Sequence, residues 1–106
     1  TERAALAARG PADLVVALDA IHHLALGNNV PLAMIAELFA TLGERLIVEF
    51  VPKGDPAVEQ LLRSRADIFD HYSTEGFQEA FAARFTIHGS QPVSGTKRTL
   101  YFMERR

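Results

Sequence analysis

Three residues that could bind a metal ion or move a proton lie close together near the start of the chain: Asp19, His22 and His23. They directly follow the apolar run DLVVAL at positions 13–18. Histidine titrates near neutral pH and serves as an acid or base in catalysis, and two imidazoles with one carboxylate form a known metal-ligand set. The stretch therefore allows three interpretations: a catalytic histidine, a metal site, or the floor of a cofactor pocket.

The spacing of these residues argues against the metal site and leaves the other interpretations open. Asp19 precedes the histidines by three and four positions, which are spacings that share one face of a helix. Neighbouring residues on a helix point in different directions, so at most one of His22 and His23 should face a pocket. A metal site needs both to converge, and we therefore expect none. A purely structural alternative is that Asp19 caps a short helix and one histidine is a hydrogen-bonded, partly buried side chain.

The elements that must position these residues follow from the apolar pattern. The run at 13–18 has no polar alternation, which predicts a parallel strand buried on both faces. Residues 20–26 predict a short helix that the turn-forming sequence GNN closes. Pro31 and the apolar residues that follow it at helical spacing predict a helix that Gly43 ends. A second apolar strand is expected at 45–51.

The second half of the chain predicts two more helices and two strands. Asp55 as N-cap with Pro56 starts one helix, and Ser73 caps the next, whose phenylalanines belong to the core. Strands are expected at 85–88 and 99–103, too close together for a helical crossover, so they should form an antiparallel hairpin. The sequence thus predicts an α/β fold, with parallel strands, helices on the faces of the sheet and a C-terminal antiparallel hairpin.

Composition narrows the class of protein. With 106 residues, 48% hydrophobic and 23% charged, the chain is one domain or part of one. It has no cysteine, which excludes disulfides and thiolate sites and favours a cytoplasmic location. A net charge of −2 argues against a nucleic-acid partner, and no apolar run reaches the ~20 residues that span a membrane. Residues 1–10 (TERAALAARG) predict the tail of a preceding helix, as if the chain were cut from a longer protein.

Three segments together resemble a known family. They are LVVALDAIHHL at 14–24, LIVEFVP at 46–52, and FTIHGSQPVSGTKRTLYFMERR at 85–106. In this order they resemble the fourth strand, the fifth strand and the final hairpin of class I S-adenosylmethionine-dependent methyltransferases. The subgroup they are most similar to includes nodulation-related methyltransferase-like proteins. The glycine-rich loop that grips the cofactor in this family has no counterpart in the sequence.

The resemblance implies that the chain is the C-terminal half of a catalytic domain, a Rossmann-like sheet with strands in the order 4-5-7-6. Ala17, Leu18 and Asp19 would then border the S-adenosylmethionine pocket, and His22 or His23 could act as a base toward an unknown methyl acceptor, such as a small molecule. We expect the isolated chain to have little or no activity, because most of the pocket would be missing.

Further residues are candidates for contact with substrate. Glu49 lies inside an apolar strand, so it must face a cleft or pair with a cation such as Arg45 or Lys53. The other candidates are Lys53, Asp70, His71 and Tyr72. Arg98, just before the last strand, is expected to face solvent.

A non-enzymatic function is the alternative. If the sheet is truncated, the strand from Asp13 to Leu18 would be an exposed apolar edge strand, which is a template for pairing with another chain. The chain would then be an interaction module that forms a homodimer through this edge.

Overall fold

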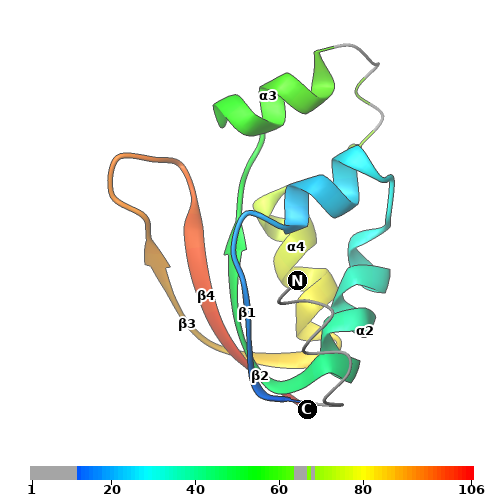
Figure 1. Ribbon diagram of the computed structural model, residues 1–106, viewed down its shortest axis with the longest axis vertical. Helices are drawn as coiled ribbons and strands as arrows, with labels where there is room; N and C mark the ends of the chain where they lie inside the picture. The colour runs from blue at the N-terminus through cyan, green and yellow to red at the C-terminus, as the bar shows by residue number, and fades with distance from the viewer. Residues whose placement is uncertain (1–11, 64–66, 68) are drawn as a thin grey trace.

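The computed structural model describes residues 12–63, 67 and 69–106, and the helix expected at 1–10 lies outside these ranges. Figure 1 shows the arrangement of the elements. In chain order they are β1 (Ala12–Ala17), the π-helical turn η1 (His23–Gly27), α2 (Leu32–Leu42), β2 (Gly43–Phe50), α3 (Pro56–Leu62), α4 (Thr74–Ala82), β3 (Phe85–Pro92) and β4 (Thr99–Arg105). Among the described residues, no helix has the length and apolar character needed to cross a membrane.

The four strands form one mixed sheet in the order β1-β2-β4-β3. β1 runs parallel to β2, whereas β4 is antiparallel to both β2 and β3. The predicted α/β class is therefore confirmed, with a parallel pair followed by an antiparallel C-terminal hairpin. The parallel pair matters most for the site, because the carboxyl ends of β1 and β2 meet at the same end of the sheet.

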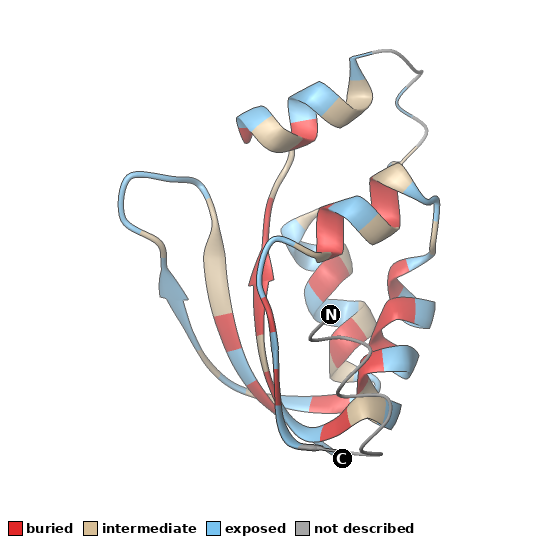
Figure 2. Cartoon of the chain, viewed as in Figure 1, coloured by how far each residue is buried: buried red, intermediate tan, exposed pale blue. Residues whose placement is uncertain are grey.

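One face of the sheet carries the core. In Figures 1 and 2, η1, α2 and α4 lie on the same side of the strands, and buried residues alternate with exposed ones along β1. Val15 and Ala17 are buried, while Leu14, Val16 and Leu18 are 45%, 51% and 55% exposed. The prediction that this strand is buried on both faces is wrong for the described structure, because the helices described here pack against only one of them.

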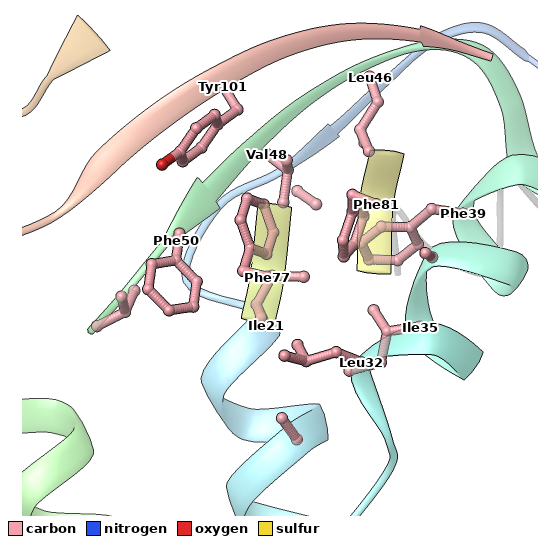
Figure 3. Close-up of a cluster of buried hydrophobic side chains, with 14 of the residues drawn as sticks. Ile21, Leu32, Ile35, Phe39, Leu46, Val48, Phe50, Phe77, Phe81 and Tyr101 are labelled. Carbon is pink, nitrogen blue, oxygen red and sulfur yellow. The ribbon is translucent and has the colours of Figure 1, made fainter. Parts of the chain in front are cut away.

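Aromatic side chains fill the space between the sheet and α4 (Figure 3). The Phe77 ring centroid lies 4.8 Å from that of Phe50, 4.6 Å from Phe81 and 4.9 Å from Tyr101. Such ring pairs add to the hydrophobic stabilisation that burial of large side chains provides. The expectation that the phenylalanines of this segment belong to the core is confirmed, since Phe77, Phe81 and Phe85 are fully buried.

The helix starts follow the sequence signals more closely than the helix ends do. Asp55 accepts a hydrogen bond from the Ala57 N–H at 2.9 Å, and Ser73 caps α4 in the same way. Gly43 does not end α2 in a left-handed turn. Its φ is −168°, extended, and it starts β2 directly, so no loop separates the two elements. The short helix expected at 20–26 is present over residues 21–27, but after its first residues it widens into the π-helical turn η1.

Candidate functional site

Polar side chains from four segments meet at the carboxyl ends of β1 and β2. We call this group the strand-end cluster; it consists of Asp19, His22, His23, Glu49, Asp55 and Arg98. The first three follow β1, Glu49 is near the end of β2, Asp55 caps α3, and Arg98 immediately precedes β4. In open α/β sheets this end of the parallel strands is where ligands bind, which makes the cluster the candidate site.

Asp19 has a backbone conformation that few residues other than glycine adopt. Its φ is +57°, in the left-handed region that aspartate tolerates better than most side chains. In this conformation its N–H donates a hydrogen bond of 2.9 Å to Glu49 Oε1. Asp19 does not cap the following helix as the structural alternative expected, because the N-cap of η1 is His22, without a side-chain bond.

Arg98 joins the carboxylates of the cluster. Its Nε and Nη2 donate to the two carboxylate oxygens of Asp55 at 3.0 and 3.2 Å. Its Nη1 lies 3.3 Å from Asp19 Oδ1 and 3.4 Å from Glu49 Oε1. The expectation that Arg98 faces solvent is wrong, since its side chain is only 22% exposed. Glu49 pairs with this arginine rather than with Arg45 or Lys53.

The electrostatic effect of this arrangement is strongest on Asp55. The hydrogen bonds from Arg98 hold the pKa of the Asp55 carboxyl below its ordinary value, and Asp55 in turn raises the pKa of the arginine. The forked geometry, with two parallel bonds to one carboxylate, is the strongest form of such a pair. Arg98 therefore fastens the hairpin end of β4 to the start of α3.

The two histidines have different environments. The His22 side chain is 0% exposed, whereas that of His23 is 56% exposed. Within the described part of the chain, neither ring nitrogen of His22 has a hydrogen-bond partner, although Nε2 lies 3.3 Å from Asp19 Oδ1. Burial, and then the neighbouring His23, lower the pKa of His22. His22 is thus not the hydrogen-bonded, partly buried histidine of the structural alternative.

The remaining sequence candidates make their hydrogen bonds outside the cluster or line a different pocket. Lys53 donates to Asp67 Oδ1 at 3.0 Å and to a backbone carbonyl at 2.8 Å, which anchors the segment after α3. Tyr72 is buried and donates its hydroxyl to the Val51 carbonyl, and burial raises its pKa. Asp70, His71 and Tyr72 line a pocket of about 480 Å³ together with residues of η1, α2 and α4.

A second hollow adjoins the strand-end cluster. It has a volume of about 710 Å³ and is lined by Glu49, Asp55 and Arg98, together with Lys97 and Gly95 of the hairpin loop. From the sequence alone, Asp55 is recognisable only as a helix cap and Arg98 is expected to face solvent. No local signal identified their role, because 43 positions separate Arg98 from Asp55 and 79 separate it from Asp19.

Comparison with known proteins finds one informative similarity. The chain is 40% identical over 104 residues to Nodulation protein NoeA of Rhizobium meliloti (strain 1021), covering 98% of the chain and 22% of that protein. The chain therefore spans about a fifth of the length of the curated relative it matches. No family model and no solved structure matches it. The relation to a nodulation protein is thus established for the sequence, and the name of the relative states no reaction.

Proposed function

We propose that this chain is the C-terminal half of an S-adenosylmethionine-dependent methyltransferase domain. The observation that carries the proposal is the sheet order β1-β2-β4-β3, with a parallel first pair and an antiparallel hairpin. It corresponds strand for strand to the 4-5-7-6 half expected from the sequence resemblance. The strand-end cluster lies at the carboxyl ends of the parallel strands, which supports the same conclusion.

Ala17, Leu18 and Asp19 are the residues that would border the cofactor. Ala17 is buried beneath the strand end, while Leu18 and the Asp19 side chain are 55% and 58% exposed next to each other. An exposed apolar side chain beside a carboxylate fits a ligand with an aliphatic chain and a cationic centre. S-adenosylmethionine, when bound, supplies a methyl group on a sulfonium sulfur.

His23 is the better candidate for a base toward the methyl acceptor. It is exposed, its Nε2 lies 3.9 Å from Asp19 Oδ2, and histidine is the side chain that most often serves as a base in catalysis. His22 is fully enclosed and has no path to an acceptor. The rest of the catalytic effect would come from alignment of the acceptor with the methyl group, which needs no further side chain of this chain.

Calorimetric titration with S-adenosylhomocysteine tests the proposal. It should be carried out on the 106-residue chain and on a longer protein in which the chain follows its natural N-terminal neighbour. We expect binding by the longer protein, and weak or no binding by the chain alone, because the sequence lacks the glycine-rich loop of this family. Absence of binding by both proteins would refute the proposal.

A matched pair of variants locates the pocket. In the longer protein, Leu18→Glu should weaken S-adenosylhomocysteine binding at least about tenfold, because it places a charge at the apolar floor. Leu38→Glu is the control, since Leu38 is a similarly exposed leucine (46%) on α2. Equal affinities of the two variants would show that β1 does not border the cofactor.

The exposed side of β1 supports a second candidate function, that of an interaction module. Among the described strands β1 pairs only with β2, and Leu14 and Val16 of this strand, with Leu18 directly after it, are all more than 40% exposed. We propose that a second copy pairs along this strand. Sedimentation should then show a dimer that Val16→Lys dissociates and Leu38→Lys does not. A monomer at high concentration would contradict this function.

A further inference from the structure

We propose that Asp19, His22 and His23 form a binding site for a divalent transition-metal ion such as Zn²⁺ or Co²⁺. This inference goes beyond the proposed methyl transfer and does not depend on it, and with an ion bound His23 would be a metal ligand in place of the base suggested above. The three residues follow β1 within five positions, and each offers one ligand atom to a common centre.

The distances between the ligand atoms are close to those that a metal requires. Asp19 Oδ1 lies 3.3 Å from His22 Nε2, and Asp19 Oδ2 lies 3.9 Å from His23 Nε2. All the ligand atoms lie within 4.8 Å of one another. Metal–ligand bonds of about 2.0–2.2 Å place the ligands of a tetrahedral ion about 3.3 Å apart, so the exposed His23 ring needs only a small rotation.

Ideal helix geometry predicts that the side chains of two adjacent histidines diverge, but in the structure both imidazoles face Asp19. The chain turns from the left-handed Asp19 into the wide turn η1, and the two imidazole rings lie with their centroids 4.3 Å apart and their planes at 36°. Both Nε2 atoms therefore approach the same carboxylate, each at a different oxygen.

His22 gives independent support for a ligand at this position. Its side chain is 0% exposed, and within the described residues neither of its ring nitrogens makes a hydrogen bond. A buried polar atom without a hydrogen-bond partner is unfavourable, because folding removes its bonds to water and supplies none in return. An ion bound at Nε2 would remove that cost for one nitrogen, because a metal–imidazole bond replaces the missing hydrogen bond.

The charges around the three ligands favour a dication. Asp19, Glu49 and Asp55 carry three negative charges, and Arg98, which contacts all three, carries one positive charge. These four groups therefore have a net charge of −2. Arg98 can withdraw Nη1 from Asp19 while it keeps both bonds to Asp55, so an ion at the carboxylate need not break that pair.

The set of ligand atoms indicates which metal ions would bind and whether a coordination position remains open for another ligand. Two imidazole nitrogens and one carboxylate suit Zn²⁺, Co²⁺ or Ni²⁺, whereas Mg²⁺ and Ca²⁺ prefer oxygen ligands alone. Three protein ligands leave at least one coordination position for water or another small ligand, as in catalytic rather than structural zinc sites.

Titration of the untagged, chelator-treated 106-residue chain with Zn²⁺ and Co²⁺ tests the site. We expect one ion per chain by calorimetry, visible absorption bands of Co²⁺ in a nitrogen and oxygen environment, and a shift of the His22 ring signals in the NMR spectrum. Mg²⁺ in excess should not displace Zn²⁺. Circular dichroism would verify that each variant is folded. His23→Ala is preferred to a substitution of His22, because the His23 side chain is exposed and its loss leaves no cavity in the core.

A matched histidine outside the site supplies the control. His88 is also 56% exposed and lies 3.2 Å from the carboxylate of Glu104. Loss of the His23 imidazole should weaken Zn²⁺ binding at least about tenfold, and Asp19→Asn should have a similar effect, whereas His88→Ala should leave it unchanged. Absence of stoichiometric uptake, equal effects of the His23→Ala and His88→Ala variants, or unchanged His22 signals would overturn the proposal. None of these readouts involves S-adenosylhomocysteine, so failure of one proposal is distinguishable from failure of the other.

Discussion

Removal of the Arg98 guanidinium should destabilise the fold more than any other single charge deletion on the hairpin. Arg98→Met keeps most of the aliphatic packing of the side chain but removes the cation that contacts three carboxylates. Two of these carboxylates are enclosed, with side-chain exposures of 5% for Asp55 and 11% for Glu49. The variant therefore leaves two mostly buried negative charges without a cation, each with a single backbone N–H as its remaining donor.

The size of the effect follows from the exposure of the pair. Removal of one partner of a fully buried ion pair costs about 3–5 kcal/mol. Because the Arg98 side chain is 22% exposed, water screens part of this, and we expect a loss of about 2–3 kcal/mol in the free energy of unfolding. For a domain of this size, each kcal/mol lowers Tm by about 4 °C, which gives a decrease of about 10 °C.

Thermal and urea unfolding monitored by circular dichroism measure this loss. Arg84→Met is the control, because Arg84 makes one ion pair of 3.2 Å with Glu37 and both side chains are more than half exposed. That variant should lose less than about 1 kcal/mol. A double-mutant cycle with Asp55→Asn, which keeps the helix cap, should show that the asparagine costs less in the Arg98→Met background.

The pH dependence gives an independent check. Arg98 holds the pKa of Asp55 below its ordinary value in the folded state. The carboxylate therefore contributes its full stability above the ordinary aspartate pKa, near pH 4, and this contribution is lost as the pH falls through the lowered pKa. The difference between the wild type and Arg98→Met should shrink below about pH 4. A difference that persists undiminished at pH 3, or one no larger than that of Arg84→Met, would refute this reasoning.

Two further predictions concern Tyr72, just before α4, and Gly76, in the first turn of α4. Tyr72→Phe should lower the free energy of unfolding by about 1–2 kcal/mol in urea titrations, because the Val51 carbonyl loses its hydroxyl donor inside the core; an unchanged midpoint would contradict the role of this bond. Gly76→Ala should cost about 1–3 kcal/mol, since a Cβ there would lie 2.0 Å from the His71 carbonyl oxygen. The same substitution at Gly89, which has nothing within 4 Å of the added atom, should cost clearly less, and equal effects would exclude the clash as the cause.

The sequence by itself determined the elements and their order, because local signals act over a few residues. Asp55 and Ser73 identified two helix starts through side-chain capping, and the structure has both. The phenylalanines of α4 identified the core by their helical spacing, and the short distance between the last two strands required a hairpin. The relation to nodulation proteins also followed from the sequence, as the similarity to NoeA supports.

Only the tertiary structure decided which groups meet at the strand ends. Arg98 reaches Asp19 across 79 positions because β4 inserts between β2 and β3, and no local pattern encodes that contact. The positive φ of Asp19 and the wide turn η1 brought both histidines toward one carboxylate, whereas ideal helix geometry predicts that adjacent residues diverge. The hydrophobic pattern likewise did not predict that one face of β1 is exposed. An apolar run shows that a strand is suited to burial on both faces, but the faces that are in fact covered depend on where the helices pack.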